Sequence, residues 1–374
     1  MQRIPELDGL RGIAILLVLM RHYIHHPSLL LFGPQWGWMG VNLFFVLSGF
    51  LITSILLRLA NQAHGGLKIF YARRTLRLFP LYFLALLVYF VASASVGTPQ
   101  PAKTVFLYVT FLQAFIPPLL THLRIIPHPD WVVMGFGVLW SLSVEEYFYV
   151  LWAPLVTFTR ANRRVLFVIL GLILFLTPWI RFFYPDPKGG QELFIAQMDS
   201  LAAGCLVAVL WQDHGAAWQT GIRHWAGRLY ICIVGLIGLA IWIDFVTGIT
   251  KRSVLDQRIF NATDYTVLWL AWSLWLLVTL AEAGTMRCMP RLLRRPVLVW
   301  VGRISYCLYV VHYPIYLALR NYVPHSFALI GALAISLAVS SLSWRYFEGP
   351  IARWKQRQFR YRMETQPEAP LVRL

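Results

Sequence analysis

Long, uninterrupted runs of apolar residues dominate this chain, for example in segments 12–20 and 166–176. A segment of about 20 apolar residues can cross the hydrocarbon core of a bilayer as a helix. Only 13% of the residues are charged and 58% are hydrophobic, whereas a soluble domain carries about 25% charged residues. We therefore predict an all-α polytopic membrane protein. An ordinary soluble enzyme, a disordered chain and a fibrous protein are excluded.

The apolar runs predict ten membrane-spanning helices. Their ranges are 10–28, 36–57, 76–96, 139–159, 165–184, 195–212, 228–247, 262–283, 297–319 and 326–346. A further apolar stretch, 105–120, is short and contains Pro117-Pro118. This composition favours a re-entrant or interfacial segment over an eleventh span.

The distribution of basic residues gives the predicted orientation. The net charge of +17 would suggest nucleic acid in a soluble protein, but Lys and Arg gather in the cytoplasmic loops of membrane proteins. With ten spans and a cytoplasmic N-terminus, roughly 24 of the 33 basic residues lie on the inner side. An eleventh span would move the basic tail outside. Ten spans, with both termini cytoplasmic, are therefore the prediction.

The chain shows no internal repeat, so we predict one transmembrane domain (1–350) and a basic cytoplasmic tail (351–374). Within this tail, segment 353–362 resembles a membrane-surface helix that contacts anionic lipid, although a stop-transfer role fits equally well. No cleavable signal peptide is expected, because a small-residue cleavage site does not follow the first apolar run. The four cysteines are scattered, so neither a disulfide framework nor a zinc site is predicted.

Ionisable side chains within predicted spans are functional candidates, because burying them in a bilayer is costly. Arg11 and His22 are eleven residues apart on the first predicted helix. That separation is about 16 Å of rise and about three turns, so both side chains point in the same direction. The pair suits a substrate that enters from inside and reacts near the outer half of the membrane. A snorkelling arginine and an interfacial histidine are the alternative interpretation.

Three arginines lie where the third predicted span begins. Arg74 and Arg77 share a helix face, and Arg73 adds a charge beside them. Guanidinium groups bind phosphate through paired hydrogen bonds, so this cluster fits a phosphorylated donor such as a nucleotide or coenzyme A. Ordinary positive-inside anchoring explains the same residues.

Two further groups of polar residues lie near the outer side. Glu145 and Glu146 open the fourth predicted helix, and a carboxylate at that depth could orient His22. His312 lies in an aromatic-rich segment that could contact a sugar, or it could be a core histidine. His25 and His26 continue the spacing of His22, but the sequence offers no HExxH motif or cysteine cluster, so no metal site is predicted.

Eight motifs occur together in one order along nearly the whole chain. They are ELDGLRG (6–12), Arg11-x10-His22, FFVLSGFLI (44–52), RRTLRLFPLY (73–82), WSLSVEEYFY (140–149), MDSLAAG (198–204), RISYCLYVVHYPI (303–315) and YFEGP (346–350). In this combination the chain resembles the acyltransferase-3 family of integral-membrane acyltransferases. Asn42, where an aspartate is common, and Gln197, where an arginine often precedes Asp199, depart from the family pattern.

The resemblance implies a multi-pass protein of the bacterial inner membrane. It would transfer an acyl group, usually acetyl, from acyl-coenzyme A to a hydroxyl of an extracytoplasmic glycan. It implies catalytic roles for His22, Arg11 and Glu145. Acyl-CoA would bind Arg74, Arg77 and Arg73. We add His312, Tyr309 and Trp140 as candidate acceptor-binding residues.

No fused extracytoplasmic hydrolase-like domain is expected after the last predicted helix, so transfer is expected in the membrane domain or through a separate partner. Besides the donor and the glycan, membrane lipids are expected partners and nucleic acid is not. A proton-coupled transporter or flippase of a lipid-linked glycan is the alternative, because such proteins also carry ionisable residues within their spans. Against it, the sequence shows no inverted repeat and no matched broken helices.

Overall fold

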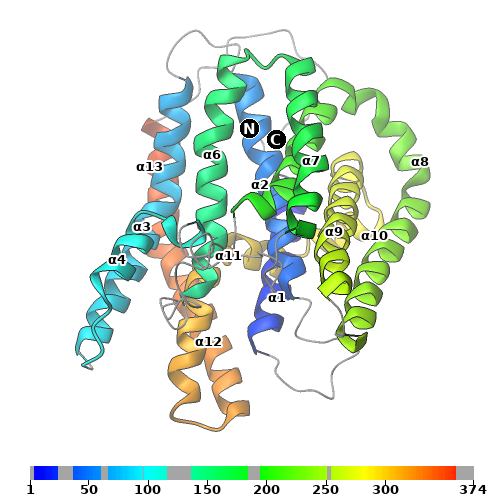
Figure 1. The fold of residues 1–374 in the computed structure, drawn as a ribbon. Coiled ribbons are helices and arrows are strands. Elements are labelled where there is room, and N and C mark those ends of the chain that lie inside the picture. The colour runs from blue at the N-terminus through cyan, green and yellow to red at the C-terminus, as the bar shows by residue number, and fades with distance from the viewer. Residues whose placement is uncertain are drawn as a thin grey trace.

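The computed structural model describes residues 4–23, 37–59, 66–95, 97–115, 136–183, 194–250 and 254–358, without the side chains of 247–250, 254, 256, 257 and 356. Every regular element within these ranges is helical, which confirms the predicted all-α class. Figure 1 shows the long helices side by side as a bundle.

The longer helices cover each of the ten predicted ranges at least in part. They are α1 (Pro5–Tyr23), α2 (Trp38–Leu59), α3 (Gly66–Ser95), α6 (Trp140–Phe158), α7 (Arg163–Phe183), α8 (Met198–Thr250), α9 (Val254–Glu282), α11 (Pro296–Arg320) and α12 (His325–Ser343). Shorter helices are α4 (Ala102–Val109), α10 (Cys288–Leu293) and α13 (Gly349–Gln358). Single turns are η3 (Leu112–Ala114), η4 (Gly137–Leu139), η5 (Phe194–Gln197) and the π-helical η6 (Trp344–Glu348).

Six helical segments are long and apolar enough to cross a membrane by length and composition. They are Trp38–Leu59, Gly66–Ser95, Arg163–Phe183, Phe194–Val246, Arg258–Glu282 and His325–Lys355. The predicted number of ten spans stays a prediction. Helices α1, α6 and α11 do not meet the criterion, and they carry many of the ionisable candidates named above: Arg11, His22, Glu145, Glu146, Arg303 and His312.

Three differences from the predictions concern α3, α8 and the stretch 105–120. Helix α3 begins ten residues before the predicted start. The basic residues of segment 66–75 lower its hydropathy, which excludes it from the predicted span, but they do not break the helix. The predicted spans 195–212 and 228–247 lie in one continuous helical segment made of η5 and α8, and α8 arches over at the upper right of Figure 1. Of the stretch 105–120, the described part is the end of α4 and the turn η3, while residues 116–120 lie outside the described ranges.

Helices α1 and α11 pack together in parallel with their backbones in close approach. A Cβ atom at Gly12 would overlap the carbonyl oxygen of Leu298, and one at Gly302 would overlap that of Asp8. Small residues permit this approach between membrane helices. The contact fixes the register of α1 against α11, and therefore the positions of Arg11 and His22.

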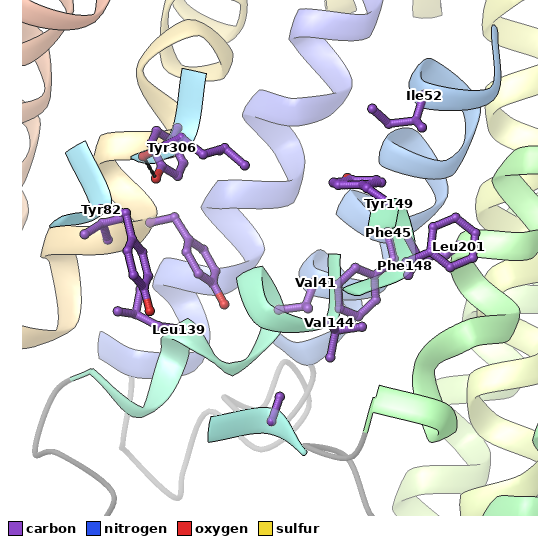
Figure 2. Close-up of a cluster of buried hydrophobic side chains, with 14 of the residues drawn as sticks. Val41, Phe45, Ile52, Tyr82, Leu139, Val144, Phe148, Tyr149, Leu201 and Tyr306 are labelled. Carbon is purple, nitrogen blue, oxygen red and sulfur yellow. Dashed lines mark hydrogen bonds between the residues drawn. The ribbon is translucent and has the colours of Figure 1, made fainter. Parts of the chain in front are cut away.

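A second close contact joins α2 to α8. Cβ atoms at Gly49 and Gly204 would overlap the carbonyl oxygens of Leu201 and Val46, respectively. Next to this contact, Phe45, Phe148 and Tyr149 lie together between α2 and α6, with Leu201 of α8 beside them (Figure 2). Helix α2 thus lies at the centre of the bundle, and 72% of the residues in its most apolar 18-residue stretch are buried.

Both ends of the described chain flank one cavity. Ile4 and Asp8 at the start of α1 line it together with Ile351 and Lys355 of α13. The two ends therefore lie on the same side of the bundle. The cytoplasmic assignment of that side and the division into 1–350 and 351–374 stay predictions. Residues 359–374 lie outside the described ranges.

Candidate active site

A basic cavity of about 420 Å³ opens between α1, α3, α11 and the C-terminal helices η6 and α13. Five basic and two acidic side chains line it: Arg11, Arg73, Arg77, Arg303, Lys355, Asp8 and Glu348. The excess of positive charge, enclosed by protein, creates a field that favours a polyanion. This places two of the three predicted phosphate-binding arginines, Arg73 and Arg77, in one wall.

A smaller cavity of about 90 Å³ adjoins the basic cavity. The two cavities share five lining residues: Arg11, Leu51, Ile55, Arg77 and Tyr306. From this shared wall the smaller cavity extends between α2, α6 and α11 to Ser141 and Tyr309. Its lining is largely apolar, so it suits a slim, weakly polar group better than a second phosphate.

Arg11 and Arg77 stand at the junction of the two cavities. Arg11 donates a hydrogen bond of 3.4 Å to Ser305 Oγ, but its Nε atom has no hydrogen-bond partner among the described residues. Arg77 makes no hydrogen bond or ion pair within the described ranges, and its side chain is accessible to solvent inside the cavity. Two neighbouring guanidinium groups with spare donors form a site that an anion would satisfy.

Arg74, the third predicted phosphate ligand, is already engaged by carboxylates. Its Nη2 and Nε atoms donate to Glu145 Oε2 (2.8 Å) and Glu146 Oε1 (3.2 Å). Its guanidinium carbon also lies 4.1 Å from the centre of the Tyr149 ring. Arg74 therefore has fewer donors left for a ligand than Arg77, and its contacts fix the position of Glu145.

Glu145 is the centre of a hydrogen-bond network at the edge of the smaller cavity. It accepts hydrogen bonds from Ser48 Oγ (2.9 Å), Tyr149 Oη (2.7 Å) and Arg74. These contacts place Glu145 in the candidate site. The predicted partnership between Glu145 and His22 stays a prediction.

His22 lies near the end of α1 and forms a hydrogen-bonded pair with His312 of α11. His22 Nδ1 lies 3.1 Å from His312 Nε2 and 3.0 Å from the carbonyl oxygen of Val18. His312 Nδ1 lies 2.8 Å from the carbonyl oxygen of Tyr309. Arg11 and His22 therefore both face α11, as their spacing on the first helix predicted.

These contacts assign the tautomers of both rings. A carbonyl oxygen only accepts, so Nδ1 carries the hydrogen in both histidines. The Nε2 atom of neutral His312 can then accept the hydrogen bond from His22 Nδ1. In this tautomer the Nε2 atom of neutral His22 carries no hydrogen. The pair has the arrangement of a general base held by a second imidazole.

The three predicted acceptor-binding residues have different surroundings. His312 is fully buried behind His22 and also accepts at its carbonyl from Tyr23 Oη, at 3.2 Å. This position favours a role through His22 over contact with an acceptor. Tyr309 lines the smaller cavity, and its Oη donates to the carbonyl oxygen of Val138 (2.6 Å). Trp140 packs edge-on against Phe45 in the core.

Sequence reasoning missed several residues that shape this region. The sequence identifies Tyr149 only as part of a motif, and it places Lys355 in the basic tail. Arg181 of α7 is fully buried and donates to Asp199 Oδ2 at 2.6 Å, so it supplies the cation that Gln197 lacks. Clusters of three or more His, Cys, Asp or Glu side chains that could hold a metal do not occur in the described ranges. His25 and His26 lie outside these ranges.

A family model described as "Acyltransferase domain" matches residues 4–345, which is nearly the whole chain. The chain belongs to the acyltransferase-3 family. The motifs indicated this family, and the match confirms it. The family model includes every predicted site residue, from Arg11 to His312, and ends before α13.

Curated relatives in the family include two bacterial O-acetyltransferases. The chain is 26% identical over 371 residues to "Peptidoglycan O-acetyltransferase OatA" of Listeria monocytogenes. It is 24% identical over 386 residues to "O-acetyltransferase OatA" of Staphylococcus aureus. Each match covers 94% of this chain but only 56% and 57% of the relatives, respectively. No solved structure matches the chain significantly.

Proposed function

We propose that this acyltransferase-3 protein moves an acyl group, acetyl by analogy with its relatives, from acyl-CoA to a hydroxyl of a cell-wall glycan. The observation that carries the proposal is the arrangement along α1. A basic cavity at Arg11 lies at one end, and the hydrogen-bonded pair of His22 and His312 lies near the other. A phosphorylated thioester needs both features, one for each of its ends.

The donor binds through its phosphates in the basic cavity. Arg77 and Arg11 have donors available at the junction of the cavities, and Arg73 lies in the same wall. Arginine suits this role because its planar fork binds phosphate in a bidentate manner. Arg74 holds Glu145 in place beside the donor.

The pantetheine arm then runs through the smaller cavity toward the histidine pair. Arg11 and His22 are separated by about 16 Å along α1. The apolar walls of Leu51 and Ile55 suit the methylene and methyl groups of the arm. The two cavities do not include His22 in their linings, so the thioester passes Tyr309 to reach it. The ring of Tyr309 lies 6.0 Å from that of His312.

His22 acts as the general base. Its Nε2 atom removes the proton from the acceptor hydroxyl, and the resulting oxygen nucleophile attacks the thioester carbonyl. The tetrahedral intermediate collapses by breaking the carbon–sulfur bond, and the thiolate of CoA takes the proton from His22. The products are an O-acyl ester and free CoA, and His22 returns to its starting form. No metal is needed for these steps.

The acceptor side of the proposal comes from the relatives. One of them is named for peptidoglycan, so a hydroxyl of a cell-wall glycan is the proposed acceptor. In the predicted ten-span orientation the basic cavity faces the cytoplasm, where acyl-CoA is present, and His22 lies toward the outer side of the inner membrane. Family membership favours acyl transfer over the alternative of a proton-coupled transporter or flippase.

The test is replacement of His22. The purified chain is incubated with radiolabelled acetyl-CoA and soluble peptidoglycan fragments, and both thiol release and labelled product are measured. His22→Ala should abolish transfer while CoA binding persists. His214→Ala is the matched control, because His214 is exposed on α8. Full activity of His22→Ala would remove His22 from the mechanism.

A further inference from the structure

The larger cavity is completed by residues that lie beyond the family model. The model ends at residue 345, whereas Phe347, Glu348, Ile351, Ala352 and Lys355 all line the cavity. Of these residues, Lys355 lies in segment 353–362, which the sequence predicts to be a membrane-surface helix or a stop-transfer signal. Helix α13 packs against α3 and forms part of the cavity wall.

The local structure turns α13 toward the cavity. Helix α12 continues into the π-helical turn η6, and α13 follows without a break. Isolated π-helical turns are frequent at functional sites, because the wider turn changes which face a helix presents. Ser343 Oγ donates to Glu348 Oε1 at 2.9 Å across this turn. On α13, Ile351 and Lys355 are four residues apart, so they share the face that borders the cavity.

Lys355 brings a further positive charge to a wall that is already basic. It lies within Coulombic reach of Arg77, Arg73 and Arg74, and no carboxylate pairs with it among the described residues. Like charges gathered around a cavity repel one another, and a bound polyanion relieves this repulsion. The arrangement is therefore one that a ligand with several phosphates would stabilise.

Resting on the proposed acyl-CoA donor, we infer that α13 forms part of the donor site and that Lys355 binds the 3′-phosphate at the nucleotide end of CoA. The direction of the donor supports this choice of phosphate. The acyl end leaves the basic cavity through the junction at Arg11 and Arg77, which places the diphosphate at that junction. Lys355 and Arg73 line the cavity without reaching the smaller one, so they lie at the other end of the donor.

The test measures binding of CoA and of 3′-dephospho-CoA to the purified full chain by titration calorimetry. The wild-type protein should bind CoA about tenfold more tightly than 3′-dephospho-CoA, the expected effect of one charge-assisted contact. Lys355→Ala should lose this preference, with weaker binding of CoA and unchanged binding of 3′-dephospho-CoA. Lys355→Arg should retain it.

The matched control is Arg357→Ala, which removes a basic residue exposed on the same helix and outside the cavity lining. It should bind both compounds as the wild type does. Equal weakening of both compounds by Lys355→Ala, or an unchanged preference, would overturn the assignment. Absence of any CoA binding to the wild-type chain would instead refute the proposed donor, so the two failures are distinguishable.

Discussion

Two arginine–carboxylate pairs within the bundle differ in how completely they are enclosed. The side chains of Arg181 and Asp199 are both 0% exposed, whereas those of Arg74 and Glu145 are 11% and 12% exposed. Arg181 also donates to the carbonyl oxygens of Asn261 (2.8 Å) and Ala196 (2.7 Å). The Arg74–Glu145 pair borders a cavity, next to Arg77 and its free donors.

The difference separates a pair that protein encloses completely from one that borders a cavity. The contacts of Arg181 join α7, η5, α8 and α9, and they use each of its guanidinium nitrogens. The region of Arg74 instead concentrates positive charge where a ligand can reach it. A buried charge whose donors are all satisfied holds helices together, whereas one with unused donors beside a cavity is available for binding.

Breaking the enclosed pair should have the largest effect on stability. Arg181→Ala leaves Asp199 buried without its cation, which costs roughly 3–5 kcal/mol. We expect poor yield and a large drop in the temperature at which the protein loses its monodisperse peak in detergent. Arg163→Ala is the control, because its pair with Asp213 is exposed (31% and 25%) and such pairs contribute about 0–1 kcal/mol. Similar stability of the two variants would contradict the structural role.

Removing a free arginine should affect donor binding and not stability. Arg77→Ala should lower kcat/KM for acetyl-CoA by about 100-fold, mainly through KM, because a bidentate phosphate contact is lost. The thermal stability should stay the same or rise, since repulsion from Arg11 is relieved. Steady-state kinetics and thermal stability, measured on one preparation, check both. Arg77→Lys should recover only part of the activity. A fall in stability with an unchanged KM would show that Arg77 stabilises the fold and does not bind the donor.

The smallest effect on activity is expected from Ser48, which donates a hydrogen bond to the Arg74–Glu145 pair. Ser48→Ala removes one of several hydrogen bonds to Glu145, a loss of about 1 kcal/mol. Activity should fall by about fivefold with little change in stability. The measurement is kcat/KM with acetyl-CoA, and a loss as large as that of Arg77→Ala would show that Ser48 acts directly on a substrate.

Hydropathy predicted most of the helices, and the errors in the predicted helix boundaries have physical causes. Apolar runs predicted the helix ranges because membrane helices must be apolar outside and satisfied inside. The early start of α3 escaped this reasoning, since its first turns are basic. The link between the two halves of α8, segment 213–227, lies outside the predicted spans because it is polar. It contains no proline, and the helix continues through its three glycines.

The site was predictable where its residues share one helix. The spacing of Arg11 and His22 correctly placed both on one face of α1. Partners on distant segments were not predictable in the same way. The pairing of His22 with His312 depends on the register of α1 against α11. Arg181 and Lys355 reach their positions only through packing of α7 and α13, which a single sequence does not reveal.

Helix α1 sets a fixed length within the proposed enzyme, because Arg11 and His22 stand on this one helix, and the backbone contact at Gly12 and Gly302 keeps α11 from sliding past it without steric overlap. The distance from the arginine cluster at Arg11 to the imidazole that we propose as the base therefore cannot adjust to the cargo. A thioester on a short carrier, anchored at the same arginines, would stop before reaching His22. Selection among acyl donors would then depend on carrier length as well as on charge.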